Sequence, residues 1–234
     1  MKNRLFGIGV GPGDPDLITL KAKRVLEKAD LIVYPAPENG ESLAKGIAIS
    51  HFPESCEELA IYIPMNTNHF PAMEIYKSAS ERIYAAVQEE KIVCVLCEGD
   101  PFFYGSFMYL FSFLKNRCSI EVIPGVSSIM AGSAILSSPL AAGNDILTIL
   151  PAPLSDSSLE RQIRLADSFV IIKIGRHFSR VRLLLAKLNL LEQALYIERA
   201  TMATERIIDI TEVDPQTVPY FSIIFVHTRN RAWQ

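Results

Sequence analysis

The chain has 234 residues, a formal net charge of −3, and a composition of 49% hydrophobic and 21% charged residues. A chain of this length can bury a core without disulfides or metals, as one large domain or two small ones. The slight acidic excess argues against a nucleic-acid-binding protein, which usually carries a basic excess.

The four cysteines are too few for a disulfide framework in a chain of this length. Cys94 and Cys97 have CxxC spacing but lie in an apolar strand, where residues three apart point to opposite faces, so we expect buried thiols. The uncharged stretch Val122–Asn144 is interrupted by Pro and Gly and predicts turns and a short helix, not a membrane span. We therefore expect a cytoplasmic protein.

The first half of the chain alternates strands with helices. Apolar runs that end at Gly, Pro or acidic residues predict strands at 5–10, 31–34, 60–63 and 92–96. Helices are expected from Asp14, a candidate N-cap followed by Pro15, to about Asp30, and at 42–50, 73–90 and 106–114. This alternation indicates a parallel α/β sheet.

The second half is richer in strands, and the polar residues 115–119 before it are the candidate linker. Strands are expected at 120–123, 146–150, 169–174, 195–197, 206–210 and 222–227, with helices near 128–136, 159–166 and 179–188. Only turns separate the last three strands, which predicts antiparallel pairing. The sequence thus predicts two α/β domains, residues 1–115 and 120–234, with a cleft between them.

Polar turns follow many of the predicted strands, at the sheet edge where open α/β sheets bind ligands. The turns are Gly9–Pro15, Glu98–Gly105, Pro124–Ser128, Lys173–His177 and Glu198–Met202. In the fourth turn and the helix after it, Lys173, Arg176, His177 and Arg180 form a cationic cluster that suits an anionic substrate.

Several common sites do not fit these turns. Counted from Gly9, the sixth position of G-x-G-x-x-G is Asp14, so the dinucleotide fingerprint is broken, and no P-loop motif exists. Ile129 stands where a G-x-S-x-G nucleophile elbow needs Gly. Plain tight turns, a capped helix start at residues 127–128 and a surface role for His177 stay open as alternatives.

Taken together and in order, these segments resemble the tetrapyrrole (corrin/porphyrin) methyltransferase family over nearly the whole chain. The matching segments are Gly9–Ala22, Gly99–Gly105, Pro124–Ser128 and Glu198–Thr201. The variants Cys97–Tyr109, Lys173–Phe178 and Glu198–Met202 resemble the branch that methylates a bridging carbon of the cobalamin precursor ring. Action at a different ring position is the alternative, followed by a module that binds the nucleoside without transferring a methyl group.

The resemblance implies an S-adenosylmethionine-dependent enzyme, usually a homodimer, of two α/β domains with the co-substrate in the cleft between them. It implies a small-molecule tetrapyrrole substrate, no nucleic-acid or membrane partner, and no protein-bound metal, since the sulfonium methyl is already electrophilic. Carried over by motif, the implied cofactor contacts are Pro12, Glu98, Gly99, Asp100, Phe103, Ser127, Ser128, Ile174 and Ala200.

Within the implied site, Asp100 is the candidate catalytic carboxylate, which would accept a proton or stabilise positive charge on the ring. The alternative is that Asp100 only holds its own turn by accepting backbone N–H groups. Glu98 is the second candidate. The acetate and propionate groups of such a substrate have Arg176, His177 and Arg199 as hypothesised partners.

Overall fold

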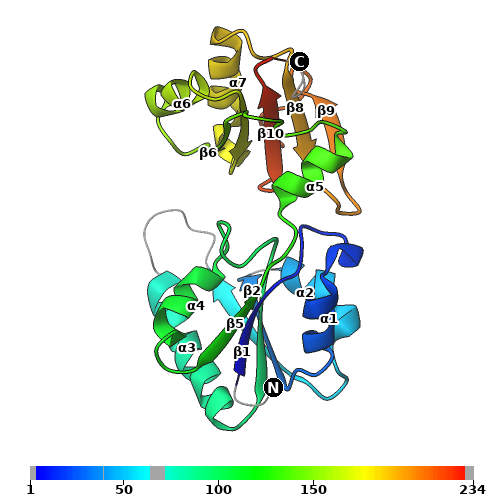
Figure 1. Ribbon diagram of the computed structural model, residues 1–234, viewed down its shortest axis with the longest axis vertical. Helices are drawn as coiled ribbons and strands as arrows, with labels where there is room; N and C mark the ends of the chain where they lie inside the picture. The colour runs from blue at the N-terminus through cyan, green and yellow to red at the C-terminus, as the bar shows by residue number, and fades with distance from the viewer. Residues whose placement is uncertain (1–3, 39, 64–71, 230–234) are drawn as a thin grey trace. The chain divides into compact units, whose positions relative to one another are not determined.

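The computed structural model describes residues 4–38, 40–63 and 72–229. The chain forms two compact units, residues 1–127 and 128–234, each built around its own five-stranded sheet (Figure 1). The α/β character predicted from the sequence is therefore confirmed in both units.

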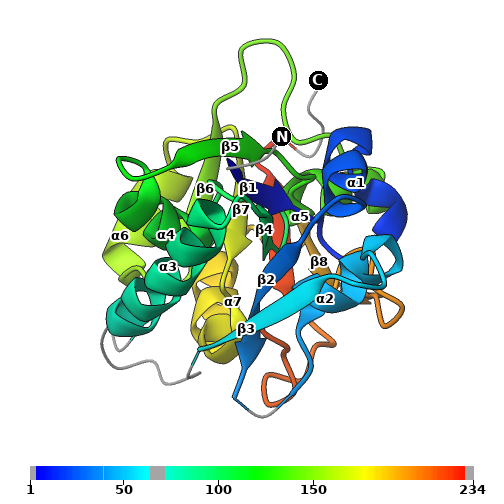
Figure 2. The same ribbon diagram turned by 90° about the horizontal axis from the view of Figure 1, so that it is seen from below.

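The N-terminal unit contains a fully parallel sheet with strand order β3-β2-β4-β1-β5. Its strands are β1 (Arg4–Gly9), β2 (Leu31–Pro37), β3 (Glu57–Ile63), β4 (Ile92–Cys97) and β5 (Ser119–Ile123). The helices between them are α1 (Leu20–Leu26), α2 (Leu43–Ala48), α3 (Ala72–Gln88) and α4 (Phe107–Leu114). Figures 1 and 2 show α3 and α4 on one face of this sheet and α1 and α2 on the other.

Alternating side chains of the buried strand β4 supply the two cores of this unit. Val95 and Cys97 pack in the core that contains α3 and α4, whereas Cys94 and Leu96 pack in the core that contains α1 and α2. Both cysteines are buried and free, which confirms that their CxxC spacing places them on opposite faces.

The single helix predicted from Asp14 to about Asp30 is wrong. Asp14 caps only a 3₁₀ turn, Pro15–Leu17, by accepting the N–H of Asp16 at 2.9 Å. The α-helix begins at Leu20 and ends at Leu26, because the extended residue Thr19 provides a second cap whose Oγ1 accepts the N–H of Ala22.

Strand β2 continues through Pro35, where the sequence predicted that it would stop. Its pairing with β4 covers only Leu31–Val33, while its pairing with β3 runs to Pro37. Pro35 therefore lies where the strand has a partner on one side only, and a residue without an N–H is tolerated there.

The predicted domain boundary at residues 115–120 differs from the structure. The strand expected to open the second domain is β5, which pairs in parallel with β1 inside the first sheet, from Arg4↔Ser119 to Ile8↔Ile123. The chain passes from one compact unit to the other after Ser127.

The C-terminal unit contains a mixed sheet with strand order β6-β7-β10-β8-β9. Its strands are β6 (Leu147–Pro151), β7 (Ser168–Ile172), β8 (Ala194–Glu198), β9 (Arg206–Asp209) and β10 (Ser222–His227), and its helices are α5 (Ser128–Ile135), α6 (Asp156–Ile163) and α7 (Phe178–Lys187). Only β6 and β7 are parallel; the antiparallel pairing predicted among the last three strands is confirmed by the β10·β8 and β8·β9 ladders.

Helices cover both faces of the second sheet. Side chains of α6 and α7 pack in the larger core, and Ile129 of α5 packs on the opposite face with Val170, Ile197 and Phe225. In the part of the chain that the structure describes, no helix is both long and apolar enough to cross a membrane.

Candidate functional site

The first sheet changes its winding direction between β1 and β4, which are hydrogen-bonded neighbours. From β1 the chain moves past β4 to β2, and from β4 it moves past β1 to β5. Open α/β sheets bind ligands outside the carboxyl ends of the strands at such a switch point. The turns Gly9–Pro15 and Glu98–Gly105 begin there.

These two turns are hydrogen-bonded to each other beyond the ends of their strands. Gly99 donates its N–H to the carbonyl of Gly11 at 2.8 Å, and Gly11 donates to the carbonyl of Gly99 at 3.3 Å. Both residues have positive φ, +81° and +62° for Gly11 and Gly99, a conformation that glycine adopts without strain. Pro12, which follows, is buried.

A third turn, at Pro124–Ser128, packs against the first two turns, and the contacts are made by the backbones of glycines. A Cβ on Gly125 would lie 2.0 Å from the carbonyl oxygen of Gly99, and a Cβ on Gly9 would lie 2.5 Å from the nitrogen of Gly125. Three segments that the sequence placed at separate strand ends therefore meet at one edge of the first sheet. The side of Gly99 itself is open, with only the carbonyl of Val126 near it, at 3.9 Å.

Asp100 ties two of these turns together. Its Oδ1 accepts the N–H groups of Phe102 at 2.9 Å and Phe103 at 3.1 Å, and its Oδ2 accepts the N–H of Gly125 at 3.1 Å. Both oxygens of the candidate catalytic carboxylate thus accept backbone hydrogen bonds, which gives Asp100 the structural role that the sequence left open.

Glu98 is the other carboxylate at this edge, and it differs from Asp100. Its side chain is half-buried, and burial raises its pKa, although the backbone N–H groups of Glu98 itself and of Ala44 oppose that shift. Among the described residues, no Lys, Arg or His forms an ion pair with it. A carboxylate that has lost part of its hydration holds its proton more tightly than an exposed one.

Aromatic side chains flank the same turn. Phe102, Phe103 and Tyr104 are exposed, at 49%, 38% and 46%, although Phe102 also contacts the ring of Phe111 edge-on. Tyr104 has a positive φ of 55°, a strained conformation for a residue with a side chain. The turn therefore presents apolar surface beside the polar backbone.

The remaining predicted contacts of this region are Ser127 and Ser128. Ser127 ends the N-terminal unit, and Ser128 begins α5 and the C-terminal unit. Both are partly buried.

The predicted residues of the C-terminal unit also share one edge of their sheet. β7 and β8 both run antiparallel to β10, which lies between them, so their carboxyl ends point the same way about 10 Å apart. Ile174 and Arg176 follow β7, while Arg199 and Ala200 follow β8. Ile174 is fully buried and Arg176 is exposed.

His177 lies in the 3₁₀ turn Gly175–His177 beside two cations. Burial lowers its pKa, and the positive charges of Arg176 and Arg180 lower it further. Arg176 Nε lies 3.4 Å from His177 Nε2, which is the acceptor of a neutral imidazole in this arrangement. His177 is therefore suited to hydrogen bonding, and Arg176 supplies the positive charge.

The backbone is strained where β7 and β8 end. Lys173, Arg199 and Thr201 have positive φ values of 58°, 48° and 69°, and two of them flank Ala200. Such strain costs about 1–3 kcal/mol per residue and gathers at ligand sites. Arg199 is held in this conformation by donating its N–H to the carbonyl of Phe221 at 2.7 Å.

The buried carboxylate of Glu198 forms an ion pair with Arg199, a feature that the sequence analysis missed. Glu198 is 3% exposed and accepts the hydroxyl of Tyr196 at 2.9 Å. Its Oε2 lies 3.7 Å from Nη1 of both Arg199 and Arg206. In the sequence, only the neighbouring Glu198 and Arg199 at a strand end could have indicated this ion pair. The contact between Glu198 and Arg206 depends on the β8·β9 register, which pairs these two residues.

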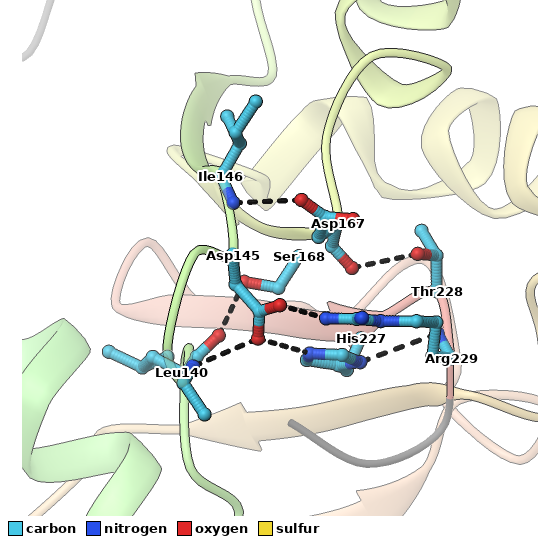
Figure 3. A network of polar contacts seen from close by, with 9 residues as sticks. Leu140, Asp145, Ile146, Asp167, Ser168, His227, Thr228 and Arg229 are labelled. Carbon is cyan, nitrogen blue, oxygen red and sulfur yellow. Dashed lines mark hydrogen bonds and ion pairs between the residues drawn. The ribbon is translucent and has the colours of Figure 1, made fainter. Parts of the chain in front are cut away.

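A second polar network lies at the opposite edge of the C-terminal sheet (Figure 3). The side chain of Asp145 is 5% exposed, accepts from His227 Nε2 at 3.2 Å, and pairs with Arg229. A cavity of about 130 Å³ lies beside it, with the buried Oε1 of Gln193 in its lining lacking a hydrogen-bond partner within the described chain. This edge holds none of the predicted site residues, and the network joins the loop before β6 to the end of β10.

Comparisons with known proteins agree with this arrangement. Residues 4–214 match the model of the family described as Tetrapyrrole (Corrin/Porphyrin) Methylases. The chain is 40% identical over 231 residues to the cobalamin biosynthesis protein CobIJ of Mycobacterium tuberculosis, covering 95% of this chain but only 45% of that protein. This chain thus spans about half the length of CobIJ.

Two further relatives match over nearly their whole length. A precorrin-2 C(20)-methyltransferase of Sinorhizobium sp. is 34% identical, covering 95% of this chain and 94% of the relative. A cobalt-precorrin-2 C(20)-methyltransferase of Salmonella typhimurium is 30% identical, covering 100% and 99%.

Two solved structures share the fold. The cobalt precorrin-4 methyltransferase CbiF has a TM-score of 0.74 at 22% identity, covering 97% of this chain and 96% of that chain. The uroporphyrin-III C-methyl transferase of Thermus thermophilus, complexed with S-adenyl homocysteine, has a TM-score of 0.66 at 23% identity, covering 95% and 91%.

Proposed function

The chain belongs to the tetrapyrrole (corrin/porphyrin) methylases, and we propose that it methylates carbon 20 of precorrin-2 or cobalt-precorrin-2 with S-adenosylmethionine, giving precorrin-3A or its cobalt form in cobalamin biosynthesis. The observation that carries the proposal is the match to relatives named for this reaction, at 34% and 30% identity over nearly their whole length. The variant segment Cys97–Tyr109 supports the same branch of the family.

The glycine-lined edge of the first sheet fits the co-substrate. Where a Cβ of Gly99 would lie, the carbonyl oxygen of Val126 is the only described atom within 4 Å apart from the two chain neighbours, so a ligand can approach the backbone of this turn. Pro12, Gly99 and Phe103 would hold it here together with Ser127 and Ser128, and Ile174 and Ala200 would contribute from the second sheet. The co-substrate supplies an electrophilic methyl group on a sulfonium, a chemistry for which we propose no protein-bound metal.

The protein's own residues would orient the substrate and handle charge. The substrate bears several acetate and propionate groups, for which the guanidinium of Arg176 is an exposed partner. Glu198 would position Arg199 through their ion pair. Neutral His177 would donate a hydrogen bond to the substrate or accept one from it. Asp100 would keep the turns at Gly99 and Gly125 in register, so that the attacking ring carbon, the methyl carbon and the leaving sulfur are held in line.

We extend the proposal to the assembly and the compartment. The family resemblance supports a homodimer, and the free thiols at Cys56, Cys94, Cys97 and Cys118 suit the reducing cytoplasm. Gel filtration with light scattering tests the first point, since a monomeric mass would contradict it.

A turnover assay tests the function. The purified chain is incubated with S-adenosylmethionine and, in parallel, precorrin-2, cobalt-precorrin-2 or uroporphyrinogen III. We expect one methyl group to be added to precorrin-2 or its cobalt form, as seen by product mass. Methylation of uroporphyrinogen III alone would contradict the proposal.

A further inference from the structure

Two arginines of the C-terminal unit face one buried carboxylate. Arg199 follows β8, and Arg206 begins β9, the antiparallel neighbour of β8, so both lie at the carboxyl end of β8. The Nη1 atom of each lies 3.7 Å from Oε2 of Glu198, whose side chain is 3% exposed. The other carboxylate oxygen, Oε1, accepts the hydroxyl of Tyr196 at 2.9 Å. A hydrogen bond on one oxygen therefore fixes the carboxylate, and the other oxygen faces both guanidinium groups.

The two arginines carry more positive charge and more N–H donors than Glu198 uses. One carboxylate neutralises one guanidinium, so one positive charge is left in excess. A separation of 3.7 Å is longer than a hydrogen bond, so Nη1 of neither arginine donates to Glu198. Among the described residues, Glu198 is the only carboxylate that forms an ion pair with Arg199 or Arg206. The guanidinium donors are therefore available to a second carboxylate.

Both side chains are accessible and belong to one face of the sheet. The exposed fraction is 36% for Arg199 and 62% for Arg206. Arg206 is the cross-strand partner of Glu198, which lies two residues after Tyr196, so these three side chains are directed to the same face. Tyr196 packs there in the core that contains α6 and α7.

The beginning of α7 lies beside this network. The ring of Phe178, the first residue of α7, contacts the ring of Tyr196 edge-on, with the centroids 5.4 Å apart. Arg176 and His177 directly precede Phe178, and the proposed function gives both of them contacts to the substrate. Arg199 and Arg206 therefore extend the cationic edge that begins at Arg176.

The fold fixes the direction in which the chain leaves β8. Arg199 and Thr201 have positive φ values of 48° and 69°, a costly conformation that gathers at ligand sites. The N–H of Arg199 donates to the carbonyl of Phe221 at 2.7 Å, and the N–H of Thr201 donates to Oε2 of Glu205 at 2.6 Å. Glu205, the neighbour of Arg206 in the chain, thus serves the backbone of this turn.

On the basis of the proposed function, we propose that Arg199 and Arg206 together bind one carboxylate group of a ligand. Glu198 is the positioning residue that holds both guanidinium groups, and Arg206 is a binding residue that the sequence analysis did not identify. A guanidinium offers a carboxylate two parallel N–H donors, which makes such contacts directional. The carboxylate belongs either to an acetate or propionate group of the tetrapyrrole or to the amino-acid part of S-adenosylmethionine.

Steady-state methyl transfer and calorimetric binding of S-adenosylmethionine test this subsite in Arg206→Gln. The substitution removes the charge but keeps a long hydrogen-bonding side chain. We expect a binding constant to weaken about tenfold at unchanged kcat, because the lost charge-assisted hydrogen bonds stabilise the ground state and the transition state alike. A higher Kd for S-adenosylmethionine assigns the carboxylate to the co-substrate. A higher KM for the tetrapyrrole at unchanged Kd assigns it to the substrate.

Two further readouts separate binding from a structural role. The weakened constant should depend less on salt concentration in Arg206→Gln than in the wild type, because salt screens the charge that the variant lacks. The double variant of Arg199→Gln and Arg206→Gln should weaken the constant by less than the product of the single effects, because both arginines bind the same group. Arg206→Lys, which keeps the charge but not the planar fork, should lie between Arg206→Gln and the wild type.

Arg164→Gln is the matched control. Arg164 is also 62% exposed and pairs with Glu160, but it lies between α6 and the amino end of β7, at the opposite edge of the same sheet. Its binding constants should equal those of the wild type.

Unchanged constants in Arg206→Gln, or a lower kcat without a change in either constant, would overturn the subsite and leave the proposed function intact. If Arg206→Gln melts below the wild type, Arg206→Lys decides by the same criteria. If the wild-type chain methylates neither form of precorrin-2, the proposed function fails and the subsite fails with it.

Discussion

The junction of three glycine backbones predicts a large effect from one methyl group. In Gly125→Ala the new Cβ would lie 2.0 Å from the carbonyl oxygen of Gly99, where contacts below 3.0 Å are essentially never seen, so the two turns must separate by about 1 Å. The carbonyl oxygen of Gly99 is a backbone atom, so it cannot move away by rotation of a side chain. Overpacking of this kind costs about 1–3 kcal/mol.

The same separation weakens the hydrogen bond from Gly125 to Asp100, which is 3.1 Å long. Hydrogen bonds to charged groups contribute about 1.5–3 kcal/mol. We therefore expect a loss of about 3 kcal/mol or more, which lowers the melting temperature by roughly 6–12 °C for a chain of this size. Because a displacement of about 1 Å in a binding site can cost about 100-fold in activity, affinity for S-adenosylmethionine should fall as well.

Gly46→Ala is the matched control. Gly46 lies inside α2, where a Cβ would have nothing within 4 Å, and alanine is favoured over glycine in a helix by about 1 kcal/mol. Thermal unfolding by circular dichroism and calorimetric binding of S-adenosylmethionine are measured for both variants. If Gly125→Ala melts and binds like the wild type, the three turns are not packed as described.

Three further predictions concern other parts of the molecule. Tyr196→Phe removes the hydroxyl that donates to buried Glu198, so urea unfolding should report a loss of about 1–3 kcal/mol; an unchanged midpoint would mean that water replaces the hydroxyl. Asp145→Ala leaves His227 and Arg229 without their buried partner (Figure 3) and should cost about 3–5 kcal/mol, with methyl transfer unaffected at a temperature where the variant is folded. For Glu98, whose folded pKa is raised, the stability it contributes below its ordinary pKa of 4.5 is lost as pH rises through the folded pKa. Glu98→Gln should therefore melt higher than the wild type at pH 8 and equal to it at pH 4, and a lower melting temperature at pH 8 would contradict the burial of a carboxylate there.

Local chemistry was enough to predict much of the fold. The buried strand β4 is a continuous apolar run, and it ends directly before Glu98, Gly99 and Asp100. The long helix predicted at residues 73–90 occurs at Ala72–Gln88, because its apolar spacing is regular and it contains neither Gly nor Pro.

The errors arose where a distant partner or a second cap decides the outcome. β5 has the same local pattern whether it joins the first sheet or the second, and only its pairing with β1 assigns it. Thr19 competes with Asp14 for the helix start, which spacing alone does not reveal.

The same limit applies to the candidate site. Its turns were visible as motifs, but the different surroundings of Asp100 and Glu98 were not. Asp100 is tied to Gly125, 25 residues away, and Glu98 is set apart by desolvation. The sequence placed Glu198 in the turn after a strand, but it did not reveal that this carboxylate is buried and lies 3.7 Å from two arginines.

The most direct test of the proposed function is the position of the transferred methyl group. Precorrin-2 and cobalt-precorrin-2 are each incubated with the chain and with S-adenosylmethionine carrying a ¹³C-labelled methyl, and the products are analysed by NMR. The account predicts a single labelled methyl on carbon 20 in at least one of the two products. A label on any other ring carbon, or no label in either product, would contradict it.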